Sequence, residues 1–260
     1  MDQKIVKMAR TGYAAKGIVY SITGALTFMA AFNMGGQQTG KTGVIDFLQK
    51  QPFGNVLLAL IALGLLCYAG WRFVQTFKDP ENIGSDKKGK AKRFAFFISG
   101  LIYLSLAALA VKKLIDAGSS GGGAKTFGFL SGQLGIVVFV VIGLSLIGIS
   151  IAQFKKAYSG KFLRKFEYKS ISEEKRRKTI KNTGYLGIVS RGIIFGVLAF
   201  IFLRAAYHSN TNDIKSTTDA FSFLQDSSYG AWLMGLVALG FVCYGIYMIA
   251  TAKYRQFSNS

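Results

Sequence analysis

The chain has 260 residues, 51% of them hydrophobic, with 31 glycines but only 2 prolines. This composition is too apolar for an ordinary soluble domain and favours a membrane protein. The formal net charge of +20 could suggest a nucleic-acid partner, but the distribution of that charge along the chain argues against one.

Six apolar segments are each long enough to cross a bilayer as a helix. About 20 residues suffice, because roughly 30 Å of hydrocarbon is crossed at about 1.5 Å per residue. The apolar runs are continuous, whereas the strands of a membrane barrel would alternate in polarity. The sequence therefore predicts an all-α membrane protein with six transmembrane helices, at about residues 12–34, 55–77, 94–115, 134–154, 184–206 and 232–251.

Basic residues are concentrated on one side of this predicted topology. Of the 32 Lys and Arg residues, 25 lie at the termini, in the even-numbered loops or at the adjoining helix ends. The positive-inside rule then places both termini in the cytoplasm. We therefore expect no nucleic-acid partner, and we expect membrane lipids, with anionic headgroups at the cytoplasmic face, to be partners; the sequence does not identify a protein partner.

The hairpin formed by the first two spans recurs along the chain. The segment from Gly17 to Tyr20 (GIVY) aligns with Gly100 to Tyr103 (GLIY) and Gly192 to Phe195 (GIIF). Lys16 aligns with Arg191, and ALGLLCY at residues 62–68 returns as ALGFVCY at 238–244. An even number of spans per unit makes the repeats parallel, so we expect three hairpins around a pseudo-threefold axis along the membrane normal.

This triplicated pattern of ARTGYAAKGIVY, QPFG and ALGLLCYAGWR resembles the bacterial integral-membrane family catalogued as domain of unknown function 1206. The resemblance implies a six-helix membrane protein, here of the bacterial cytoplasmic membrane, and no established activity. The predicted organisation is unit 1 at residues 1–85, unit 2 at 86–160, a basic linker or helix extension at 161–183, and unit 3 at 184–260.

Short segments outside the spans are also predicted to be structured. Thr42–Gln49 and Thr217–Gln225 precede returning spans and suit short turns or helices at the membrane interface. In the linker, Ser170 and Glu173 form a capping-box pattern, and Glu174 favours the same helix start. The linker is interpreted as a solvated extension of the fifth span or as a platform for anionic lipid headgroups.

The spans hold few groups that could carry catalysis. His208 is the only histidine, so it lacks the partners of an acid–base pair or a metal site. No Asp or Glu lies within a predicted span, which argues against a proton-coupled carrier or a carboxylate-selective cation pore. We expect no enzyme activity, no metal and no cofactor.

Three basic residues lie within the predicted spans, slightly inside the cytoplasmic edge: Lys16, Arg72 and Arg191. Their side chains could snorkel towards the lipid headgroups. Alternatively, they could face the axis and form a cationic cluster that contacts an anion or a lipid phosphate. Four aromatic residues near the same level suit an aromatic belt or a pore lining: Tyr68, Trp71, Tyr244 and Tyr247.

Small residues in the spans are predicted to mark close helix contacts. The two cysteines occupy equivalent positions in units 1 and 3, where unit 2 has glycine, so small size explains them better than redox or metal chemistry. In unit 2, Leu104 interrupts the small-residue face, which predicts looser packing. The predicted packing residues are Gly17, Ser21, Gly24, Cys67, Gly100, Gly148, Gly192, Gly196 and Cys243.

Two classes of function fit these observations. In the first, the bundle is channel- or carrier-like and admits a small solute, an anion or a lipid headgroup along its axis. In the second, the protein is a structural or accessory membrane subunit that binds lipids or another membrane complex, with its axis packed shut. Large apolar side chains along the whole axis would remove the physical basis of the transport alternative.

Overall fold

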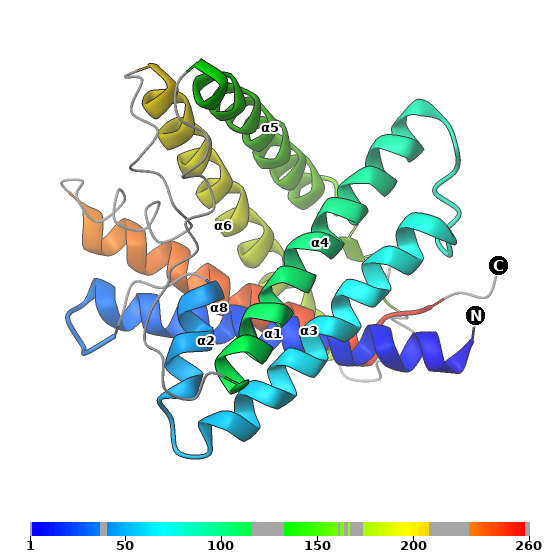
Figure 1. Cartoon of the computed structure of the whole chain (residues 1–260), viewed down its shortest axis with the longest axis horizontal. Coiled ribbons are helices and arrows are strands. Elements are labelled where there is room, and N and C mark those ends of the chain that lie inside the picture. The colour runs from blue at the N-terminus through cyan, green and yellow to red at the C-terminus, as the bar shows by residue number, and fades with distance from the viewer. Residues whose placement is uncertain are drawn as a thin grey trace.

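The computed structural model describes residues 2–36, 41–115, 133–160, 162–163, 166, 174–207 and 229–257. The regular secondary structure in these ranges is helical, with no β-strand, which confirms the predicted all-α class. Figure 1 shows the arrangement of the helices. They are α1 (Gln3–Ala31), α2 (Lys41–Gln49), α3 (Gly54–Phe77), α4 (Lys87–Ile115), α5 (Gln133–Tyr158), α6 (Glu174–Tyr207) and α8 (Gly230–Tyr254).

Six of these helices are long and apolar enough to cross a membrane, which confirms the six predicted spans. Large apolar side chains such as Leu60, Val141 and Leu236 are exposed on their outer surfaces, as expected where lipid replaces water. Helix α2 confirms the short helix predicted between the first two spans. Its predicted counterpart in unit 3, residues 217–225, lies outside the described residues, as do the capping pair Ser170 and Glu173.

The linker ends in a helical extension of the fifth span. Helix α6 begins at Glu174, the residue whose charge favours a helix start, and continues without a break to Tyr207. Its first turns carry exposed basic side chains, including Lys175 and Lys178. The described part of the linker is therefore a helical extension of the fifth span, and whether its basic side chains meet water or lipid headgroups stays a prediction.

The six long helices form an open ring. In the order α4, α3, α1, α8, α6 and α5, each helix packs against the next. The ring is open between α4 and α5, the two helices of unit 2, which do not pack along each other. In Figure 1, α5 and α6 diverge from α4 and leave unit 2 splayed. Accordingly, only 28% and 17% of the apolar windows of α4 and α5 are buried, against 44% to 56% in the other four spans. This low burial reflects the splay of unit 2; the looser contact predicted from Leu104 stays a prediction, because Leu104 is itself exposed while Gly100 packs against Phe73 of α3.

Glycines at aligned positions make similar contacts where one unit meets another. At three of these glycines, an added Cβ atom would lie within 3.1 Å of a side chain on a helix of the neighbouring unit. The three pairs are Gly17 with Ile249, Gly100 with Phe73, and Gly192 with Phe154. These contacts are compatible with triplication, although the pseudo-threefold axis itself stays a prediction.

Within units 1 and 3, a glycine lets the two helices of the hairpin approach closely. A Cβ atom at Gly12 would lie 2.5 Å from the backbone of Tyr68, and one at Gly187 would lie 2.5 Å from the backbone of Tyr244. The structure contradicts the packing role predicted for Gly148, because no atom lies within 4 Å of a Cβ atom there. The cause is the splayed hairpin, which leaves this face of α5 without a neighbour among the described residues.

Other predicted packing residues do lie at helix contacts. Gly24 approaches the backbone of Ala238 and Val242 in α8, and Ser21 lies against Gly245. A Cβ atom added at Gly196 would make an ordinary van der Waals contact, 3.4 Å from the Ser150 hydroxyl oxygen. Small residues thus bring α1 against α8 and α6 against α5.

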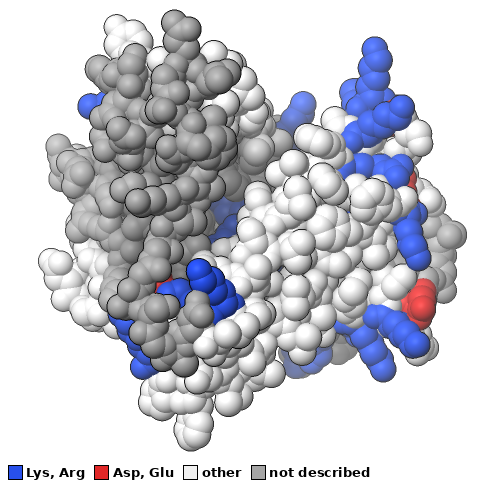
Figure 2. All heavy atoms as spheres, viewed as in Figure 1, with Lys and Arg blue, Asp and Glu red and all other residues white. Residues whose placement is uncertain are grey.

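Both chain termini lie at the same end of the bundle, here called the terminal end (Figure 1). Figure 2 shows most of the visible Lys and Arg side chains at this end, on the right, with a smaller group at the lower left. The described surface between these groups is largely uncharged, as a membrane-facing belt must be.

Candidate functional site

Lys16 lies at the centre of the ring, among tyrosines from four helices. Its side chain is only 4% exposed, and its ammonium group donates a 2.8 Å hydrogen bond to the Tyr68 hydroxyl. The Nζ atom lies 4.6 Å from the ring centroid of Tyr68, 5.2 Å from that of Tyr103, 5.7 Å from that of Tyr244 and 5.8 Å from that of Tyr20. Snorkelling is therefore excluded for Lys16.

Units 1 and 3 each contribute one cation–tyrosine pair at aligned positions. Arg191 aligns with Lys16, and Tyr244 aligns with Tyr68. Arg191 donates from Nη1 to the Tyr244 hydroxyl at 2.5 Å, and its guanidinium carbon lies 4.5 Å from the centroid of that ring. The splayed unit 2 has Ser99 and Ile149 at these positions, so it supplies no such pair.

Arg72 joins the same group from the last turns of α3. It donates from Nη2 to the Tyr68 hydroxyl and from Nη1 to Oε1 of Gln75, the latter at 2.8 Å. Its guanidinium carbon also lies 4.8 Å from the centroid of the Phe96 ring in α4. Arg72 therefore shares its hydroxyl acceptor with Lys16, and the structure brings all three sequence-predicted cations around one set of tyrosines.

A fourth cation, Lys41, reaches the tyrosines from α2. Its Nζ atom lies 5.3 Å from the centroid of Tyr20 and 5.0 Å from that of Tyr103. Lys41, Arg72 and Arg191 all lie close enough for their positive charges to repel the ammonium group of Lys16. We call the following set the cation–tyrosine cluster: Lys16, Lys41, Arg72 and Arg191 with Tyr20, Tyr68, Tyr103 and Tyr244.

None of the four cations forms an ion pair with a carboxylate of the described residues. Glu81, in the loop between α3 and α4, is linked to Arg72 through Gln75, which donates to Glu81 at 2.5 Å and accepts from Arg72. The Nε atoms of Arg72 and Arg191 are buried and have no hydrogen-bond partner among the residues that the structure describes. The cluster is thus rich in positive charge and retains unused hydrogen-bond donors.

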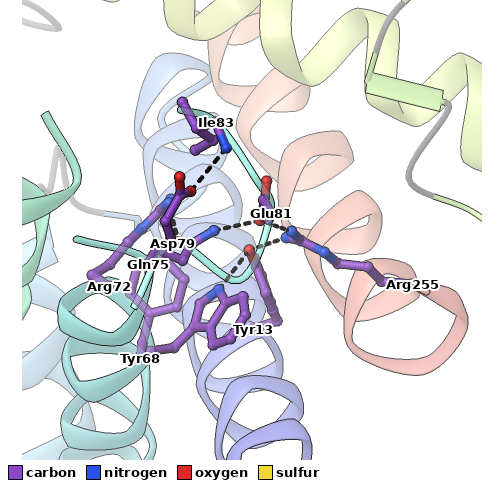
Figure 3. Close-up of polar contacts among 9 residues, drawn as sticks. Tyr13, Tyr68, Arg72, Gln75, Asp79, Glu81, Ile83 and Arg255 are labelled. Atoms are coloured by element: carbon purple, nitrogen blue, oxygen red, sulfur yellow. Dashed lines mark hydrogen bonds and ion pairs between the residues drawn. The ribbon is translucent and has the colours of Figure 1, made fainter. Parts of the chain in front are cut away.

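Glu81 itself binds Arg255, which closes the terminal end (Figure 3). Arg255 follows α8 directly; it is 6% exposed and also donates to the Tyr13 hydroxyl. The Trp71 indole N–H donates to the same hydroxyl at 3.2 Å. We call Arg255, Glu81 and Tyr13 the terminal clamp, since they join α1, the α3–α4 loop and the end of α8.

Asp79 holds the α3–α4 loop that carries Glu81. Its carboxylate accepts backbone hydrogen bonds from Ile83 and Gly84, both at 2.9 Å. Figure 3 shows the bond to Ile83 beside the clamp. These two bonds lower the pKa of Asp79 below its usual range, because they stabilise the ionised form.

A small pocket opens beside the cluster between α1, α2, α6 and α8. Its volume is about 30 Å³. Arg191 and Lys41 supply its charged lining, and Ile194, Phe195 and Phe241 form an apolar wall; Tyr20 and Thr23 complete the lining. The pocket thus places two cations of the cluster against one small volume.

The four aromatic residues predicted as a belt or a lining are all buried inside the bundle. Tyr68, Trp71, Tyr244 and Tyr247 are at most 3% exposed. The belt alternative is wrong, because belt residues contact the lipid interface. Tyr68 and Tyr244 belong to the cluster, Trp71 contacts the terminal clamp, and Tyr247 packs against Phe162 and Phe166. The pore-lining alternative stays a prediction.

Cys67 and Cys243 are free and half-buried. No group of three or more His, Cys, Asp or Glu side chains assembles among the described residues. His208 lies outside those residues.

Sequence reasoning missed Tyr20, Tyr103, Lys41 and the terminal clamp. Tyr20 and Tyr103 occupy the same position of the repeated GIVY motif, so their recurrence was a usable signal. Lys41 could not be found in this way, because it lies outside the spans and enters the bundle only through the placement of α2. Glu81 and Arg255 were equally invisible, since a loop and a chain end meet there only in the folded protein.

The fold and the site define a polytopic α-helical membrane protein with a cationic, tyrosine-rich interior. Residues 11–79 and 186–255 match the family described as Domain of Unknown Function (DUF1206), and the chain belongs to this family. The matched ranges cover units 1 and 3, the two units whose hairpins are closed and carry a cation–tyrosine pair.

The chain is also 28% identical over 254 residues to a protein of Bacillus subtilis (strain 168) described as uncharacterized protein YxxB. The alignment covers 97% of this chain and 92% of that protein. No solved structure matches the chain.

Proposed function

We propose that the protein is a channel- or carrier-like membrane protein that binds a small anion at the cation–tyrosine cluster. One observation carries this proposal: four cationic side chains converge inside the ring, and no described carboxylate pairs with any of them. An anion that enters the ring would supply the missing negative charge.

The energetic basis is the cost of burying charge. Moving an ion out of water costs several kcal/mol even after the protein relaxes, and like charges add mutual repulsion. Cation–π contacts return only about 0.5–2 kcal/mol each, and tyrosine hydroxyls offer partial solvation. The aromatic surroundings therefore reduce the cost without neutralising the charge, which leaves the site suited to an anion.

The interior of the bundle around the cluster supports passage better than a plug of apolar side chains would. Lys16, Tyr68 and Arg191 lie within the predicted spans and meet inside the bundle, where large aliphatic side chains would have favoured a closed, structural core. The terminal clamp lies on one side of the cluster and Lys41 on the other. Both are candidate barriers to a solute that crosses the bundle.

A second candidate is a non-transporting accessory subunit that binds lipids or another membrane complex. The open side of the ring favours it, because α4 and α5 leave side chains such as Leu104 and Leu144 exposed where a lipid or a partner helix could pack. In that case the cluster would hold a lipid phosphate or stay closed.

We further propose that the terminal end faces the cytoplasm and that the membrane is the bacterial cytoplasmic membrane. The concentration of Lys and Arg at the terminal end supports this orientation through the positive-inside rule. Reporters fused to the C-terminus test this orientation. A reporter that is active only in the cytoplasm should be active in this fusion. Activity of a reporter that works only outside the cytoplasm would contradict the orientation.

Anion flux in vesicles tests the transport proposal. Purified protein in liposomes should release loaded chloride or nitrate faster than empty liposomes do. Arg72→Gln should lower the rate at least tenfold, whereas Arg204→Gln, a matched change of an exposed arginine in α6, should leave it unchanged. Wild-type flux no faster than the leak of empty liposomes would refute transport and favour the accessory role, which predicts a stoichiometric partner after purification in gentle detergent.

A further inference from the structure

We infer that the pocket lined by Arg191 and Lys41 is a binding site for one small monovalent inorganic anion, of halide or nitrate size. This inference rests on the proposed function and assigns its ligand class and its place. The pocket lies between α1, α2, α6 and α8, so it would be formed jointly by units 1 and 3.

The charged lining supplies the attraction. Arg191 and Lys41 border the same volume, and each is held by tyrosine rings rather than by a carboxylate of the described residues. The Nη1 group of Arg191 is occupied by the Tyr244 hydroxyl, but its buried Nε–H has no acceptor within the described part of the chain. An unused guanidinium donor costs free energy when it is buried, and an anion in the pocket would satisfy it.

Pocket size limits the ligand to a small species. A volume of about 30 Å³ holds roughly two water molecules, since one needs at least about 10–15 Å³. A halide or nitrate fits within this volume, whereas sulfate, phosphate and organic carboxylates such as gluconate would have to project beyond it.

The uncharged lining selects for low charge and weak hydration. Ile194, Phe195 and Phe241 offer no hydrogen bonds to replace a hydration shell. On entering a pocket with such an apolar lining, a divalent anion loses far more hydration energy than a monovalent anion does. Two cations against an apolar wall therefore favour one weakly hydrated monovalent anion.

Lys41 gives the site a link to α2. It is the first residue of α2, and this short helix packs against α1, α3 and α4. Anion binding would hold Lys41, and with it the start of α2, against the Tyr20 and Tyr103 rings. Lys41→Gln should therefore weaken binding while leaving the hydrogen bonds of Lys16 and Arg191 in place.

Thermal unfolding of the full-length protein in detergent, with anions varied at constant ionic strength, tests the site. A ligand that binds only the folded state raises the melting temperature in a saturable manner. We expect saturable stabilisation by bromide, chloride and nitrate, and none by sulfate or gluconate. Lys41→Gln and Arg191→Gln should each raise the apparent Kd for bromide at least tenfold, and Arg204→Gln should leave it unchanged.

Two results would overturn the inference: bromide stabilisation that persists in both pocket variants, or stabilisation by sulfate that exceeds that by bromide. Should Arg191→Gln fail to fold, Lys41→Gln decides the matter, because Lys41 is only partly buried and lies at the start of the short helix α2. The same variants in the flux assay separate this inference from the proposed function. Binding without flux would refute transport but keep the site, and flux unaltered in both variants would refute the site but keep transport.

Discussion

The Tyr244 hydroxyl group is the acceptor that holds Arg191 inside the ring. Tyr244→Phe keeps the aromatic ring and its cation–π contact but leaves Nη1 without its partner. A hydrogen bond to a charged group contributes about 1.5–3 kcal/mol, so we expect a loss of this order in unfolding free energy. Denaturation in mixed detergent measures it, with Tyr229→Phe as control because Tyr229 is exposed. Equal effects of the two changes would contradict the assigned bond.

Asp79 makes the α3–α4 loop sensitive to pH. Its pKa is lowered in the folded protein by the backbone bonds from Ile83 and Gly84. This contribution to stability is therefore present above the ordinary aspartate pKa of about 4 and is lost as the pH falls through the lower folded value. Asn tolerates the left-handed backbone at this position, where φ is +43°.

Asp79→Asn should therefore preserve the turn but weaken both backbone bonds at neutral pH. We expect amide exchange at Gly84, corrected for its intrinsic rate, to become faster in the variant at pH 7. Protection in the wild type should fall towards that of the variant in acid. Identical protection in both proteins at neutral pH would show that the carboxylate does not hold the loop.

At the scale of the helices, glycine positions decide which hairpins close. Gly187→Ala places a methyl group 2.5 Å from the backbone of Tyr244, and backbone atoms cannot rotate away. We expect destabilisation of about 1–3 kcal/mol and separation of α6 from α8, which also disturbs the Arg191 pair. Gly148→Ala is the matched control, since its Cβ atom meets nothing within 4 Å, and it should be neutral or slightly stabilising.

Thermal unfolding of these two variants distinguishes a packing role from a general preference for glycine. A lower melting temperature for Gly187→Ala alone supports the close approach of α6 and α8. Equal loss in both variants would mean that α5 also packs tightly through Gly148, contrary to the splayed arrangement of unit 2.

The terminal clamp joins elements far apart in the sequence. Arg255 binds both Tyr13 and Glu81, so it connects the end of α8 to α1 and to the α3–α4 loop. A double-mutant cycle with Arg255→Gln and Glu81→Gln should give a coupling energy of about 1–3 kcal/mol, because both partners are largely buried. Strictly additive effects on unfolding would show that the ion pair does not stabilise the clamp.

At the scale of the whole molecule, hydropathy predicted the six spans because a bilayer imposes length and apolarity on each helix separately. The aligned glycines and the Lys16 and Arg191 match also anticipated contacts that the folded chain makes. Gly148 was predicted wrongly because a small residue shows that a close contact is possible, not that a neighbouring helix is present.

The position of Lys16 could not be decided from the depth of one helix in the membrane. Snorkelling was plausible for a lone helix in lipid, but the tyrosines of α3, α4 and α8 surround Lys16 once the ring forms. Lys41 and Arg255 could not be predicted as interior residues for the same reason, since both reach the interior from outside the predicted spans. Such partners depend on tertiary placement, which neither periodicity nor charge counting along the chain contains.

The central claim is that the interior of this membrane protein binds an anion. An experimental structure of the full-length protein in bromide, with bromide located by its anomalous scattering, tests it most directly. We predict a peak in the pocket between the Arg191 guanidinium and the Lys41 ammonium, and loss of that peak in Lys41→Gln. Bromide found only among the exposed basic side chains of α6, with the pocket empty, would contradict it.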